Sequence, residues 1–129
     1  MKKVILIAFA TVVALYPTVS QAATFKSGDI YSLGQGQAVS GDLYVGSGSV
    51  SISGDVNGDL FAAGGNVVIS GAVAQDVTAA GSAVVIGGTV RDDVRAAGGN
   101  VTINGAVGGD VIIGGGQVSI GSGTIGGDL

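Results

Sequence analysis

The chain has 129 residues, of which 26 are glycine and only one is proline, and it contains neither cysteine nor histidine. It therefore cannot form disulfides or metal sites with thiolate or imidazole ligands, and the single proline excludes a collagen-like chain. All nine acidic residues are Asp, a turn-forming residue, and no helical spacing of apolar residues follows residue 22. The composition thus favours an all-β protein.

The segment 1–22 has the pattern of a secretory signal peptide. Lys2 and Lys3 precede an uncharged apolar run from Val4 to Tyr16, and then come Pro17 and small residues ending at Ala22. We expect cleavage after Ala22 and export of the remaining chain, while an uncleaved anchor and a core element are the alternative interpretations.

The exported chain would be acidic. Without residues 1–22 it keeps three basic residues against nine Asp, a net charge of −6. Such a charge, with no basic stripe, disfavours contact with nucleic acid and with anionic lipid headgroups.

The segment 23–37 reads as a damaged copy of the repeat that follows it. Asp29 lies closer to Asp42 than the later Asp residues lie to one another. Because a solenoid needs an atypical terminal unit, we expect this segment to be an N-terminal cap. Phe25, Tyr31 and Leu33 would lie over the open end of the core.

The segment 38–129 repeats with a period of 17. The repeat is marked by a column of aspartates, with one extra residue before the last: Asp42, Asp59, Asp76, Asp93, Asp110 and Asp128. Aliphatic columns follow in step, among them Val50, Val67, Val84, Val101 and Val118, and Ile52, Ile69, Ile86, Ile103 and Ile120. A fixed period of this size predicts a β-solenoid, here of about five coils, in which like residues stack about 4.8 Å apart.

The pattern within one repeat predicts a triangular coil. Two alternating apolar pairs and one single apolar position are separated by glycines, which indicates three short strands and three corners. Successive aliphatics Leu60, Val67 and Val73 lie 7 and 6 apart, which breaks the even hexapeptide rule of left-handed helices, so we expect a right-handed β-helix. Glycines such as Gly71 serve either a positive φ or a close approach between coils.

These columns resemble those of a known family. The phrases "VNGDLFAAGGNVVISGAV" and "VRDDVRAAGGNVTINGAVGGDVIIGGGQVSI" are similar to bactofilins, bacterial polymer-forming cytoskeletal proteins, and most of all to their exported relatives. The resemblance covers Val39 to Leu129. It implies a right-handed β-helix that associates end to end without nucleotide. Typical bactofilins are cytoplasmic and have no signal peptide, so the location that we expect, the periplasm or the cell surface of a bacterium, follows from residues 1–22.

The Asp column permits two interpretations. Stacked carboxylates could hold Ca²⁺, which prefers oxygen ligands. The spacing does not match the nonapeptide of calcium-binding β-rolls, however, and Asp is also a common turn residue that bonds backbone amides. We therefore favour solvated turns and assign no metal.

Few other residues carry chemistry. "RDDVR", Arg91 to Arg95, is the one charge cluster and is read as a surface patch, and the Asn66 and Asn100 column is read as corner chemistry. Tyr44 and Phe61 are expected to stack in an outward column that continues with Thr78, Arg95 and Ile112. No catalytic or cofactor-binding residue is assigned, because His, Cys and Glu are absent.

The leading functional hypothesis is an exported, non-enzymatic structural solenoid. Its partners would be further copies of the chain, bound through the solenoid ends, and components of the cell envelope or membrane, with no nucleic acid and no cofactor. The alternative is a cell-surface adhesin or glycan-binding rod that presents Tyr44, Phe61 and Arg95 to a sugar. A carbohydrate-active enzyme is the least favoured hypothesis, because minimal corners form no cleft.

Overall fold

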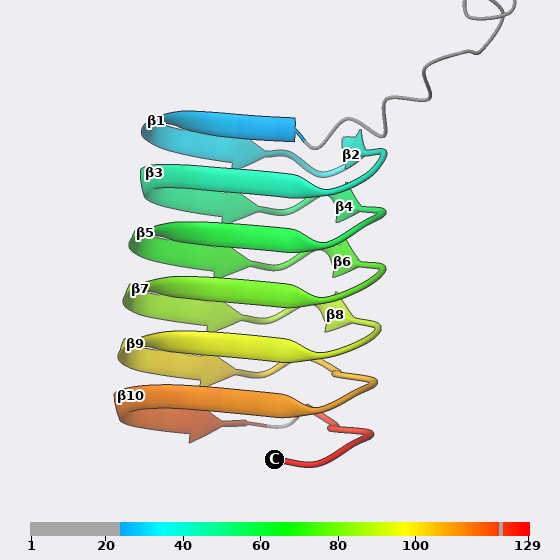
Figure 1. Cartoon of the computed structure of the whole chain (residues 1–129), viewed down its shortest axis with the longest axis vertical. Coiled ribbons are helices and arrows are strands. Elements are labelled where there is room, and N and C mark those ends of the chain that lie inside the picture. Colours follow the sequence, from blue (N-terminus) through cyan, green and yellow to red (C-terminus); the bar gives the residue numbers. More distant parts are fainter. Residues whose placement is uncertain (1–23, 122) are drawn as a thin grey trace, which may run out of the picture.

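The computed structural model describes residues 24–121 and 123–129, which contain strands and no helix. The strands stack into a β-solenoid with its axis along the longest dimension of the molecule (Figure 1). The all-β class and the solenoid architecture predicted from the repeat are confirmed. The predicted signal peptide, residues 1–22, lies outside the described residues.

The strands of the described residues form two parallel sheets. The six-stranded sheet contains the long strands β1 (Thr24–Leu33), β3 (Leu43–Ile52), β5 (Leu60–Ile69), β7 (Val77–Ile86), β9 (Val94–Ile103) and β10 (Val111–Ile120), in that order. The four-stranded sheet contains the short strands β2 (Ala38–Val39), β4 (Asp55–Val56), β6 (Ala72–Val73) and β8 (Thr89–Val90). Each long strand belongs to one turn of the solenoid, which gives six turns.

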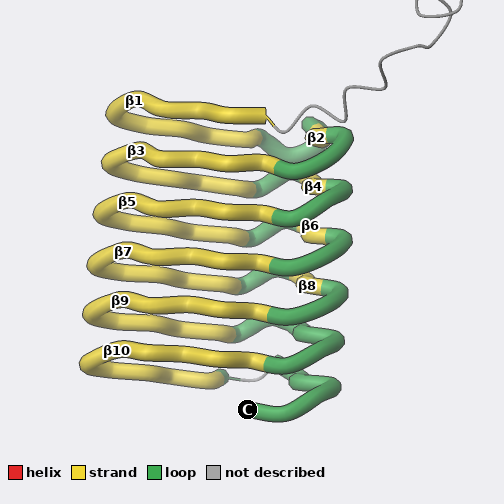
Figure 2. The backbone as a smooth tube through the Cα atoms, in the orientation of Figure 1, coloured by secondary structure: helices red, strands yellow, loops and turns green. Residues whose placement is uncertain are grey.

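One turn consists of a long strand that bends back on itself, followed by a loop that in most turns contains a short strand (Figure 2). This differs from three separate short strands, because the glycine corner lies inside the long strand. Gly64, Gly81 and Gly98 pair in register at the bend, so the parallel ladder continues on both of its sides. None of these three glycines needs a positive φ.

The aliphatic columns predicted from the repeat stack in register and form the core. Val67 pairs with Val84, and Val84 pairs with Val101, each one repeat further along the chain. These valines are buried, as is the isoleucine column that contains Ile69 and Ile86. The extra residue near 121–123 is accommodated as expected, because Val107 bridges to Ile125, one position beyond the repeat period.

The described residues of the segment predicted to be an atypical terminal unit form most of the first turn of the solenoid. Strand β1 pairs with β3 along its length, beginning with Thr24 beside Leu43. The two residues of each pair are two positions further apart in the sequence than the repeat period. Leu33 is buried in the core and Tyr31 packs partly against it, whereas the Phe25 side chain lies outside. The described part of the chain therefore has six turns where the Asp spacing predicted five.

A tight turn takes up the two extra positions of this first coil. In residues 34–37 the amide of Gly34 donates to Gln37 Oε1 at 2.9 Å, and the amide of Gln37 donates to the Gly34 carbonyl at 3.1 Å. Gly36 has a φ of +80°, which glycine adopts readily. After this turn the regular register is restored, because Val39 pairs with Val56, which lies one repeat period further along the chain.

A second glycine column marks where successive turns touch. A Cβ atom added to Gly71 would overlap the Gly54 carbonyl oxygen, and one added to Gly88 would overlap the Gly71 carbonyl oxygen. Gly105 stands in the same relation to Gly88. The close approach between turns, and not a positive φ, requires glycine in this column.

We predict that Gly88→Ala destabilises the protein by about 1–3 kcal/mol, because the new methyl group meets backbone that cannot move aside. The matched control is Gly87→Ala, since a Cβ at the adjacent Gly87 meets no atom within 4 Å. Urea unfolding followed by circular dichroism measures both changes. Equal stability of the two variants would contradict the close-approach explanation.

Candidate functional site

The Asp column joins each turn to the next through its carboxylates. Asp42 Oδ1 accepts the amide hydrogen of Asp59 at 2.8 Å, and Asp59 and Asp76 accept the amides of Asp76 and Asp93 at 3.0 Å. The same contact recurs from Asp93 and Asp110 at 2.8 Å.

Main-chain bonds at the same corner run in the opposite sense. The amides of Leu43, Leu60 and Val77 each donate to the carbonyl of the Asp in the following turn, at 2.9 Å. The Asp amide itself lies before the long strand begins, where the β-ladder provides no partner. The carboxylate of the preceding turn satisfies it, as an N-cap side chain satisfies a free helix amide.

This geometry favours the backbone-acceptor interpretation of the Asp column over a calcium site. One oxygen in each of five carboxylates already accepts an amide hydrogen from the next turn. Residues 24–121 and 123–129 contain no group of three or more Asp, Glu, His or Cys side chains that could hold a metal ion. The Asp column was predicted from the sequence, but its hydrogen bonds were expected to come from backbone amides close in sequence. In the structure they come from the amide of the Asp one turn further along.

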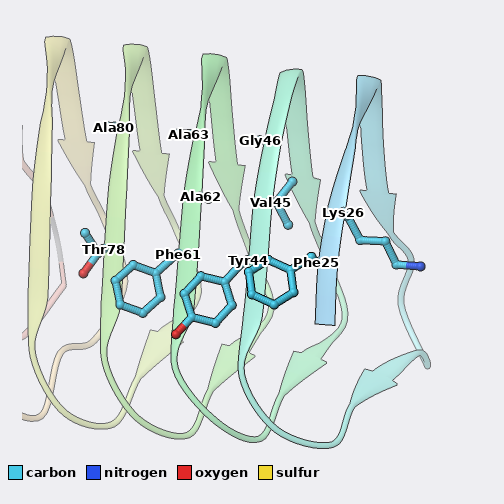
Figure 3. A pocket seen from close by; sticks show the side chains of 10 residues that line it. All are labelled: Phe25, Lys26, Tyr44, Val45, Gly46, Phe61, Ala62, Ala63, Thr78 and Ala80. Atoms are coloured by element: carbon cyan, nitrogen blue, oxygen red, sulfur yellow. The ribbon is translucent and has the colours of Figure 1, made fainter. Parts of the chain in front are cut away.

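Three aromatic rings stack on the outer face of the first three turns (Figure 3). The centroids of Phe25 and Tyr44 are 4.9 Å apart with planes inclined by 17°, and those of Tyr44 and Phe61 are 4.7 Å apart with planes inclined by 5°. The predicted stack of Tyr44 on Phe61 is confirmed. Phe25 was missed because its segment was read as a cap, although its register places it beside Tyr44.

The aromatic strip, defined as Phe25, Tyr44 and Phe61, borders a shallow hollow of about 340 Å³. A column of small residues two positions along each strand, which includes Gly46, Ala63 and Ala80, leaves this space open. Lys26 and Thr78 also line the hollow.

The remaining polar positions lie apart from the aromatic strip. Arg95 continues the same outward column, but Thr78 separates it from Phe61. Arg91 and Asp92 are exposed before β9. Asn66 pairs with Ala83 and Ala83 with Asn100, so an alanine interrupts the amide column.

The two ends of the solenoid differ in chemistry. Among the described residues, the aliphatic layer is exposed at the β10 end: Val118 is 44% exposed, and a hollow of about 400 Å³ is lined by Val111, Ile112, Ile113, Val118, Ile120 and Leu129. At the β1 end Lys26 pairs with Val45 and so takes an inward position of the repeat. Its side chain extends away from β3 in Figure 3.

Comparison with known proteins gives no match to any family model, curated protein or solved structure. Within the described part of the chain, no helix is long and apolar enough to cross a membrane.

We predict that Asp76→Ala costs about 1–2 kcal/mol of stability, because it leaves the half-buried amide of Asp93 without an acceptor. Asp76→Asn should cost less than half as much, since its amide oxygen can accept the same hydrogen. Urea unfolding measures both, with the exposed Asp92→Ala as control. Stabilisation of the unaltered protein by calcium that disappears in Asp76→Asn would contradict this role.

Proposed function

We propose that this protein is an exported, non-enzymatic structural β-solenoid that self-associates through its ends. End-to-end association is what its resemblance to bactofilins implies. The observation that carries the proposal is the apolar layer left open at the β10 end. We also infer that the solenoid is right-handed and three-sided.

The path of the chain supports this shape. In Figure 1 the nearer leg of each long strand runs from right to left and the farther leg runs back, while the chain descends, which corresponds to a right-handed winding. The two legs of the bent strand and the loop with the short strand supply three sides.

Backbone pairing supports association at the ends. Within the described residues, β1 and β10 are the outermost strands of the long sheet, and each pairs on one side only. An unpaired strand edge beside an apolar layer is a template for another strand. Docking of the β10 end of one copy on the β1 end of the next would continue the parallel ladder and produce an open filament.

The chemical difference between the ends makes the β10 end the principal contact. In a head-to-tail contact, the ammonium group of Lys26 must turn aside from the aliphatic layer of the neighbouring copy, because burying an unpaired charge is costly. Lys26 therefore limits growth in this direction. A contact between two β10 ends avoids Lys26 and stops at a dimer.

Export is proposed from residues 1–22, and the acidic mature chain fits a place in the cell envelope away from nucleic acid. N-terminal sequencing of the exported protein should begin at Ala23. A protein retained with Met1 in the cytoplasm would contradict this part of the proposal.

We predict that the chain without residues 1–22 self-associates and that Val118→Lys abolishes association. The matched control is Val68→Lys, because Val68 has nearly the same exposure, 40% against 44%, but lies on a lateral face. Sedimentation velocity and electron microscopy measure particle size. Filaments indicate head-to-tail docking and dimers indicate contact between β10 ends.

Lys26→Leu should lengthen the particles if head-to-tail docking occurs. A wild-type protein that remains monomeric at high concentration, or a Val118→Lys variant that assembles like the wild type, would refute association through the β10 end.

A further inference from the structure

We propose that the aromatic strip of Phe25, Tyr44 and Phe61 binds a linear glycan chain that lies along the solenoid axis. The strip occupies a lateral face and is distinct from the β10 end, so this proposal does not depend on self-association. It assigns a ligand class to the outward surface of β1, β3 and β5.

The rings form a rigid apolar platform. Their spacing is set by the backbone ladder, because each ring sits at the same register position of successive strands. Figure 3 shows the three rings side by side on successive strands, overlapping in this view. Phe25 is 74% exposed and Phe61 is 38% exposed, so this apolar surface is available to a ligand.

The hollow beside the rings has the shape of a trough along the axis. Its lining comes from β1, β3, β5 and β7, which belong to four successive turns. The small side chains of Ala63 and Ala80 keep the trough open next to the rings. An elongated ligand fits such a trough better than a single sugar ring does, because several units can contact successive turns.

Polar groups at the edge of the trough suit a sugar. The Tyr44 phenol and the Thr78 hydroxyl can each donate and accept a hydrogen bond. A pyranose ring presents apolar C–H groups on its faces and hydroxyls around its edge. The part of the stacked rings that stays exposed beside the trough would contact the C–H groups, and these polar groups would bond the hydroxyls.

The negative charge of the protein favours a neutral glycan over nucleic acid, the other class of ligand that stacks on aromatic rings. Bases of single-stranded nucleic acid also stack, but their phosphates need a positively charged groove. The chain from Ala23 onward carries nine Asp against three basic residues, so a phosphate chain would be repelled. A neutral polysaccharide experiences no such repulsion, and the envelope in which we place the protein contains glycans.

The experiment titrates the chain without residues 1–22 with β-1,4-linked hexasaccharides of N-acetylglucosamine and of glucose, using calorimetry. At least one hexasaccharide should bind, and should bind more tightly than its monosaccharide. Phe61→Ala should weaken binding about tenfold or more, as loss of a stacking ring does elsewhere, whereas Phe61→Tyr should retain it. Val68→Ala is the matched control, since Val68 lies on the same strand with similar exposure and should leave affinity unchanged.

A gain-of-function variant keeps the proposal testable if Phe61→Ala unfolds. Thr78 is the next position of the column, so Thr78→Tyr should extend the strip to four rings and raise affinity for the hexasaccharide severalfold. Three results would overturn the proposal: no saturable binding of either hexasaccharide, binding that is unaffected by both Phe61→Ala and Thr78→Tyr, or loss of self-association in a Phe61→Ala protein whose circular dichroism shows the native fold. The last result would identify a second copy of the chain as the occupant of the strip.

Discussion

The constraint on which this structure depends is the strict vertical register of parallel strands, in which each residue lies over its counterpart one repeat further along. Each side chain must therefore fit beside the residue at the same position of the next turn, about 4.8 Å away. Aliphatic side chains meet this condition by packing into a continuous core, as the column from Val67 to Val101 does. Glycine meets it where backbones approach too closely for a Cβ, as at Gly71 and Gly88. A single turn could not bury its own apolar face, so the fold is stabilised by contacts between neighbouring turns.

The same register creates the features that we assign to function. Carboxylates of the Asp column reach the amide of the next turn because the repeat places them one step apart, which makes the column part of the scaffold. Aromatic residues at one column position must stack, which produces a rigid strip on a lateral face. The apolar layer at the β10 end is the open edge of the same repeating core. Lateral binding and association at the ends are therefore compatible in one molecule.

The regular part of the fold could be predicted from the sequence because periodicity alone specifies which residues share a column. The first turn could not be predicted in this way. The turn at 34–37 contains two additional residues, which changes the sequence separation between paired residues, and no Asp marks the start of this coil before Thr24. The bend inside each long strand was read as a break, since glycines usually signal one, yet the ladder continues through Gly64 and Gly81. Of the candidate site, the stack of Tyr44 on Phe61 was predictable, but Phe25 and the inward place of Lys26 required the three-dimensional register.

The most direct test of this account is the measurement of nuclear Overhauser effects between valine methyl groups in the protein without residues 1–22. Val67 should give strong cross-peaks to Val84, and Val84 to Val101. Val67 and Val101 should give none, because two turns separate them by about 10 Å. Cross-peaks that connect Val67 to residues outside its column, with none to Val84, would contradict the stacked register and every conclusion drawn from it.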